Sequence, residues 1–179
     1  MHAKSLQKLV LLAALTRALP GAPVVAPPAP MAWSLGYSCF KLRPDSGTNE
    51  RMNGFALGGE YPQDPFWSLE ASVSRQTGTE ADTVALRQLG ALAGVKTTSP
   101  LGDRARGFVH LLAGWEQLHA SQGDQADQRA SLAFGPGIGL DVALTRNVSA
   151  RGQVDFLFTH YSGVVQGSPA LFVGLVYRR

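Results

Sequence analysis

From residue 33 onward, apolar and polar residues alternate with a period of two, in segments of about ten residues separated by polar, turn-rich stretches. This is the period of a β-strand with one apolar face and one polar face. The pattern predicts eight strands, over residues 33–42, 52–61, 66–75, 87–97, 106–117, 131–143, 149–160 and 169–178. No intervening stretch is long enough for a crossover helix, so we expect neighbouring strands to pair antiparallel as a meander.

The alternation varies in clarity along the chain. It is clearest in segments 66–75, 131–143 and 149–160, where apolar side chains share one parity. The segment 106–117 is ambiguous because its apolar side chains fall on both parities, with Phe108 and Leu112 on one and Val109, Leu111 and Trp115 on the other.

The polar face decides which side of the sheet faces inward. It is mostly Gly, Ser and Ala, with a few charges of both signs at Glu60, Glu70, Lys96, Asp141, Arg151, Asp155 and Arg178. A soluble barrel would need many charged residues on that face, whereas the narrow interior of an eight-stranded barrel suits small side chains and sparse, pairable charges. The pattern therefore predicts an all-β, eight-stranded, antiparallel up-and-down transmembrane barrel with its apolar face toward lipid.

Composition agrees with this interpretation. Charged residues make up 16% of the 179 residues, below the roughly 25% of a soluble protein. No stretch approaches the ~20 consecutive apolar residues of a membrane-spanning helix. The net charge of +3 comes from scattered basic residues, which argues against nucleic-acid binding. The single cysteine, Cys39, excludes an internal disulfide and a zinc cluster, and we expect neither a metal nor a cofactor.

The first 32 residues differ from the rest. Lys4 and Lys8 precede a seven-residue apolar core, residues 9–15, and small residues and prolines follow. This layout is typical of a secretory signal peptide. We therefore expect residues 1–32 to be an export signal with a Pro-rich segment and residues 33–179 to be the barrel. An amphipathic helix with a Pro-rich linker is the alternative interpretation of the same residues.

The connections between the predicted strands differ in polarity. The stretches expected on the outer side hold many polar and charged residues and cover residues 43–51, 76–86, 118–130 and 161–168. The stretches expected on the inner side are turns at residues 62–65, 98–105 and 144–148. Any extracellular ligand is expected to bind through the outer loops.

Four runs carry a family resemblance: LGYSCF from Leu35, GPGIGLDVAL from Gly135, RGQVDFLFTHYSG from Arg151, and the closing ALFVGLVYRR from Ala170. Together they resemble the eight-stranded outer-membrane β-barrel superfamily, which includes the transmembrane domain of outer-membrane protein A and the opacity-type proteins. The resemblance implies a bacterial outer-membrane location, contact with membrane lipids and lipopolysaccharide, and a lumen charge cluster of Asp141, Arg151 and Asp155. Glu70 and Arg178 lie on the same predicted face, and we include them in the cluster.

These features predict a monomeric, non-enzymatic barrel with a structural, adhesive or narrow-pore role. One alternative is an outer-membrane lipid A deacylase using His160 and Ser162, although no acidic residue follows Ser162 to complete a triad. Another is a soluble secreted barrel that binds a small apolar ligand. His110 and Glu116 could face each other inside the barrel, but two such groups do not make a metal site.

Overall fold

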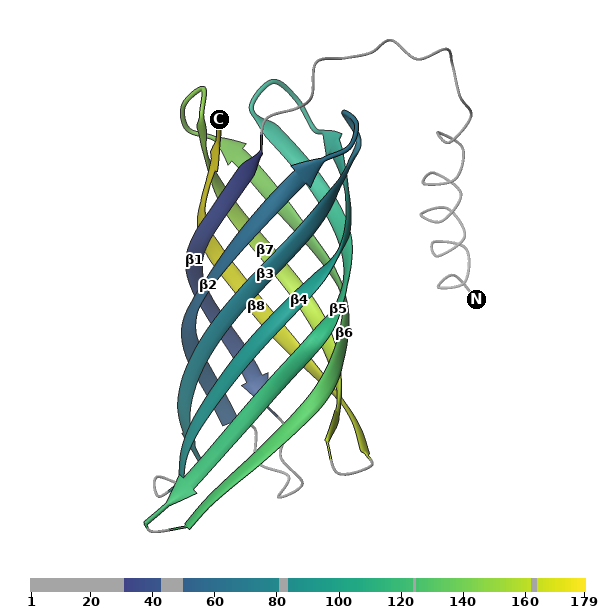
Figure 1. The fold of residues 1–179 in the computed structure, drawn as a ribbon. Coiled ribbons are helices and arrows are strands. Elements are labelled where there is room, and N and C mark those ends of the chain that lie inside the picture. The colour runs from purple at the N-terminus through teal and green to yellow at the C-terminus, as the bar shows by residue number, and fades with distance from the viewer. Residues whose placement is uncertain (1–30, 43–49, 81–83, 124, 162–163) are drawn as a thin grey trace, which may run out of the picture.

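The computed structural model describes residues 31–42, 50–80, 84–123, 125–161 and 164–179, and these form a single closed antiparallel barrel (Figure 1). The strands are β1 (Ala32–Leu42), β2 (Glu50–Pro62), β3 (Trp67–Glu80), β4 (Val84–Pro100), β5 (Ala105–Gln122), β6 (Gln125–Ala143), β7 (Val148–Tyr161) and β8 (Val164–Arg178). Each strand pairs with the next one along the chain, and β8 pairs with β1. The predicted fold class is confirmed.

The barrel has two chemically different ends. At the terminus end, where β1 begins and β8 ends, three four-residue turns join the strands, at 63–66, 101–104 and 144–147. The Asp64 carboxylate accepts hydrogen bonds from the backbone N–H groups of Phe66 and Trp67, at 2.6 and 2.8 Å. Gly102 has a φ of 139°, which L side chains rarely adopt. Local turn chemistry therefore fixes these connections.

At the opposite end, which we call the outer end, the strands are longer than predicted. Three of the predicted outer loops, 76–86, 118–130 and 161–168, are largely strand, and the β5–β6 hairpin extends furthest (Figure 1). The prediction failed here because these strand ends carry few outward-facing apolar side chains, and the apolar residues present, such as Leu86 and Leu118, face the lumen, so the alternation of the band does not continue. Backbone pairing nevertheless continues, as far as Gln122 opposite Gln125.

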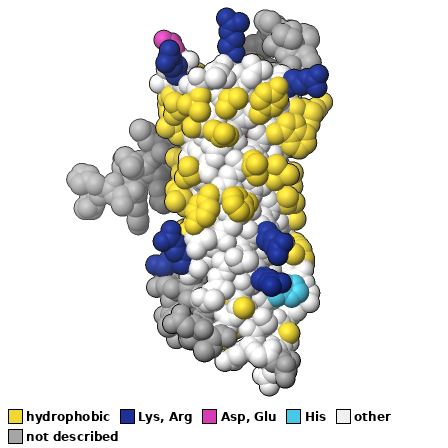
Figure 2. Space-filling view, turned by 90° about the vertical axis from the view of Figure 1, so that its left-hand side faces the viewer, with side chains coloured by type: hydrophobic (Ala, Val, Ile, Leu, Met, Phe, Trp, Pro, Cys, Tyr) yellow, Lys and Arg dark blue, Asp and Glu magenta, His cyan; other side chains and the backbone are white. Residues whose placement is uncertain are grey.

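The outer surface of the barrel carries the apolar side chains, in a broad band with Lys and Arg at both borders (Figure 2). Ile138, Val154 and Val173 are 62%, 50% and 55% exposed, which is the reverse of a water-soluble protein. The structure also settles which side chains of β5 face outward, where the sequence pattern was ambiguous. Val109, Leu111 and Trp115 face outward, whereas Phe108 and Leu112 are buried in the lumen. An apolar exterior does not fit the soluble-barrel alternative.

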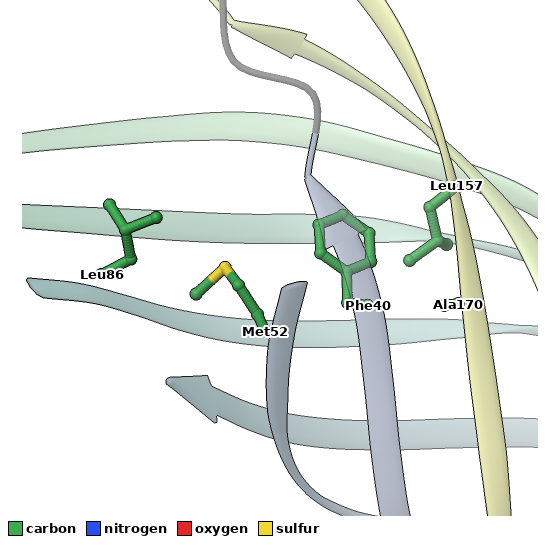
Figure 3. Close-up of a cluster of buried hydrophobic side chains, with 5 residues drawn as sticks. All are labelled: Phe40, Met52, Leu86, Leu157 and Ala170. Carbon is green, nitrogen blue, oxygen red and sulfur yellow. The ribbon is translucent and has the colours of Figure 1, made fainter. Parts of the chain in front are cut away.

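The lumen is filled rather than open. Toward the outer end, a cluster of buried apolar side chains from five strands lies across it (Figure 3). Its members are Phe40, Met52, Leu86, Leu157 and Ala170. Phe40 and Met52 are 1% and 0% exposed, so this layer separates the mid-lumen from the outer end.

The structure describes no helix that is both long and apolar enough to cross a membrane. Residues 1–30, where the export signal is predicted, lie outside the described residues, and β1 begins at Ala32.

The lumen as candidate functional site

An ion-pair network fills the lumen near the terminus end. At its centre, Asp141 of β6 and Arg151 of β7 are direct cross-strand partners. The Arg151 guanidinium donates two hydrogen bonds to the Asp141 carboxylate, from Nε at 2.7 Å and from Nη2 at 2.8 Å. Both residues are 2% exposed. Such a bidentate pair is among the strongest charged contacts available to a protein.

Arg151 also reaches strands on the other side of the barrel. Its Nη2 lies 2.6 Å from Glu60 Oε1 of β2, and its Nη1 lies 3.8 Å from Glu70 Oε1 of β3. Lys96 of β4 donates to the same Glu60 oxygen at 2.7 Å. Arg178 of β8 donates to Asp141 Oδ2 at 2.5 Å. Arg151 therefore links distant strands through the interior.

His110 of β5 joins the network through both ring nitrogens. Nδ1 lies 2.9 Å from Glu70 Oε2, and Nε2 lies 2.7 Å from Asp155 Oδ1. An ionised carboxylate only accepts hydrogen bonds, so with Glu70 and Asp155 both ionised each ring nitrogen donates and the ring is an imidazolium. The network then balances four carboxylates against four cationic groups, and these are Glu60, Glu70, Asp141 and Asp155 with Lys96, His110, Arg151 and Arg178.

Glycines of β6 make room for this network. A Cβ added at Gly137 would lie 2.0 Å from both Asp155 Oδ1 and His110 Nε2, and one at Gly139 would lie 2.2 Å from the Phe108 ring. The Phe108 ring in turn lies 4.0 Å from Lys96 Nζ, a cation–π distance. The Gly-rich run of β6 is therefore a recess into which side chains of β5 pack.

All five residues of the predicted charge cluster lie in the lumen, and each is bonded within this network. Sequence reasoning placed Glu60 and Lys96 on the polar face but left them out of the cluster. It also missed His110 as the partner of Glu70 and Asp155. The suggested approach of His110 to Glu116 is wrong, because Glu116 instead accepts a hydrogen bond from Gln88 at 2.7 Å. His110 could have been found from its position in β5, because it alternates with the outward-facing residues of that strand. The apolar residues on both faces of β5 hid this alternation.

The alternative catalytic pair falls outside the described residues. Ser162 is not described, and of His160 only the backbone is, paired with Val165. Among the residues that are described, no three His, Cys, Asp or Glu side chains gather in a way that could hold a metal ion.

Between the network and the apolar cluster, the mid-lumen holds a cavity of about 60 Å³. Glu70 and Asp155 of the network line it, together with Glu116 and with Phe40 and Leu157 of the apolar cluster. This space suits a few water molecules at most. The described lumen is therefore closed on both sides of the cavity, by ion pairs toward the terminus end and by apolar side chains toward the outer end.

No protein-family model and no curated protein sequence matches the chain. Solved structures do match its fold. Neisserial surface protein A gives a TM-score of 0.72 at 12% identity, over 83% of this chain and 97% of that protein. Ail, the attachment invasion locus protein of Yersinia pestis, gives 0.64 at 17% identity, over 85% and 99%. OprG of Pseudomonas aeruginosa, an outer membrane protein, gives 0.59 at 12% identity, over 85% and 96%. The chain thus has the closed eight-stranded fold of outer-membrane β-barrels, as its sequence predicted.

Proposed function

We propose that this chain is an exported, monomeric outer-membrane barrel that does not conduct ions. It acts through the strand ends and loops at its outer end. The observation that carries the proposal is the closed lumen. An ion crossing it would have to displace the buried Arg151–Asp141 pair and then pass Phe40 and Met52, which are almost fully buried. Breaking a buried pair costs about 3–5 kcal/mol, which opposes the passage of an ion.

The apolar band supports the membrane location, and the fold likeness supports the outer membrane in particular. The terminus end, with its short turns, the start of β1 and the end of β8, then faces the periplasm. The extended hairpins of the outer end face the cell exterior. The outer strand ends are polar and project beyond the band, so they are the parts available to an extracellular partner. One protein of similar fold is named for attachment, which agrees with an adhesive role. Recovery of the mature protein in a detergent-free periplasmic extract would contradict the location.

The first prediction concerns conductance. We expect the refolded protein, inserted into planar lipid bilayers, to give no unitary current steps, because the network and the apolar cluster both block the axis. A general porin in the same bilayers serves as the positive control, and a slower gel migration after boiling shows that the sample was folded. Reproducible current steps from the folded protein would refute the closed-lumen proposal.

A basic arc at the outer border of the apolar band supports lipopolysaccharide as a partner. It consists of the outward-facing Lys41, Arg51, Arg75, Arg87 and His119, one on each strand from β1 to β5. Lys41 is directly opposite Arg51, and Arg87 is directly opposite His119. Like charges directly opposite each other, such as Lys41 and Arg51, destabilise a sheet, and an anion bound between them would offset this repulsion. No described outward-facing residue of β1–β5 beyond the band is acidic.

The second prediction tests this arc with lipid A carrying two phosphate groups. We expect the R51Q/R87Q variant to bind it about tenfold more weakly than the wild type, because arginine pairs strongly with phosphate. Titration of the detergent-solubilised protein, followed by tryptophan fluorescence, measures the affinity. The matched variant R104Q/R129Q removes two exposed arginines outside the arc and should bind like the wild type. Equal binding of dephosphorylated lipid A by the wild type would argue against the arc as a phosphate site.

We further propose that the barrel is not an enzyme. The buried His110 is held by two carboxylates, so neither ring nitrogen contacts a Ser, Thr or Cys side chain that it could activate. A nucleophile needs a base within hydrogen-bond reach, which this histidine does not offer. The deacylase alternative predicts loss of ester-linked acyl chains from lipid A in cells that express the protein, with S162A restoring them.

A further inference from the structure

The mouth of the barrel at the terminus end is hollow. A cavity of about 600 Å³ lies there, bounded by residues of β1 to β5 and β8 and by the turns 63–66 and 144–147. Its floor includes Glu60 and Arg178 of the ion-pair network. The volume is within the roughly 300–1,000 Å³ of small-molecule sites. Its lining combines lumen-facing residues, such as Glu60 and Ser68, with the outward-facing Trp67.

Four arginines line this cavity: Arg106, Arg146, Arg178 and Arg179. Arg178 is held by Asp141 and Ser149. The side chains of the other three make no ion pair or hydrogen bond with any residue that the structure describes. They come from three separate places, the start of β5, the β6–β7 turn and the end of β8. Their guanidinium groups are exposed and only donate hydrogen bonds, so they are available to an acceptor from outside the barrel.

The two carboxylates that line the cavity do not supply that acceptor. Glu60 is bonded to Lys96 and Arg151 at 2.7 and 2.6 Å. An Asp64 oxygen is occupied by two backbone N–H groups of its own turn. The chain's own N-terminal segment does not complement the cavity either, because residues 1–30 contain basic residues but no Asp or Glu.

We propose that the cavity is a binding site for a soluble anion with at least two phosphate groups, such as a diphosphate. Three free guanidinium groups around one cavity need several acceptor oxygens at once, and a diphosphate presents them in a compact form. Arginine matches phosphate oxygens through two parallel hydrogen bonds. Prolines at 62, 65 and 100 line the same mouth and restrict its backbone, so the arginines project from a preformed frame. In the proposed orientation this site faces the periplasm.

Isothermal titration of the full-length mature protein in detergent micelles with pyrophosphate tests the site. We expect saturable binding, and we expect the R106Q/R146Q variant to bind at least tenfold more weakly. The R104Q variant is the matched control, because Arg104 lies in the neighbouring turn but does not line the cavity, and it should bind like the wild type. The gel-mobility change on boiling confirms that each variant is folded.

Three results would overturn the proposal: no heat of binding with the wild type, equal binding by R106Q/R146Q, or equally tight binding of citrate, which carries carboxylates instead of phosphates. The bilayer recordings are independent of these titrations, so a failed anion site and a conducting lumen are distinguishable outcomes.

Discussion

Replacing Arg151 by methionine is expected to lower the free energy of unfolding by about 3–5 kcal/mol, the largest single effect in this barrel. Arg151 contacts Glu60 and Asp141 within 2.7 Å and also approaches Glu70. Without the guanidinium, carboxylates remain buried with too few cations. Methionine is apolar and similarly long, so the lower free energy of unfolding would be due mainly to the missing charge and less to a missing side-chain volume. Urea unfolding in lipid vesicles, followed by tryptophan fluorescence, measures it.

The matched control is R129Q. Arg129 pairs with Asp127 at 2.9 Å, but both side chains are more than half exposed. Exposed pairs contribute about 0–1 kcal/mol, so this variant should unfold close to the wild type. An Arg151→Met protein within 1 kcal/mol of the wild type would show that the network does not stabilise the barrel.

The second large effect is expected at Gly137. Its replacement by alanine places a Cβ 2.0 Å from His110 Nε2 and from Asp155 Oδ1, so both side chains must shift, and we expect their contact to break. The imidazolium then loses one of its two carboxylates inside the barrel. We expect a loss of about 3 kcal/mol in the same unfolding experiment. A changed NMR signal of the His110 ring would link the loss to this contact.

Gly152→Ala is the control for this substitution. Gly152 is on the neighbouring strand β7, and a Cβ added there meets no atom within 4 Å. Its effect should stay within about 0.5 kcal/mol. If both alanine variants unfold like the wild type, the recess in β6 is not needed for the network.

Much of the fold was predictable because side chains alternate between an apolar face toward lipid and a polar face toward the lumen, and this alternation is visible in the sequence. On β7, Val154 and Phe156 face outward while Arg151 is buried, as their parity predicts. The outer strand ends were not predictable, because the outward apolar face stops at the end of the band, and apolar residues such as Leu86 and Leu118 face the lumen instead. The mixed parity of β5 arises because Phe108 and Leu112 pack inside the lumen.

For the site, sequence identified which charges face inward but not how they pair. Pairing across the lumen depends on strand tilt and stagger, which no local pattern encodes. Arg151 and Asp141 are neighbours on adjacent strands and were grouped correctly. The contact between Arg151 and Glu60, from β7 to β2, and the double contact of His110 required the closed barrel.

The charge network also bears on the chain before it folds. Its eight members come from seven strands, β2 to β8, so they can meet only when the barrel closes. In the unfolded chain each of these charges is hydrated and interrupts a segment of high β-propensity. Charges in such segments act as gatekeepers against aggregation. The same groups that bind the strands together in the finished lumen therefore help to keep the unfolded chain dispersed in water before the barrel closes.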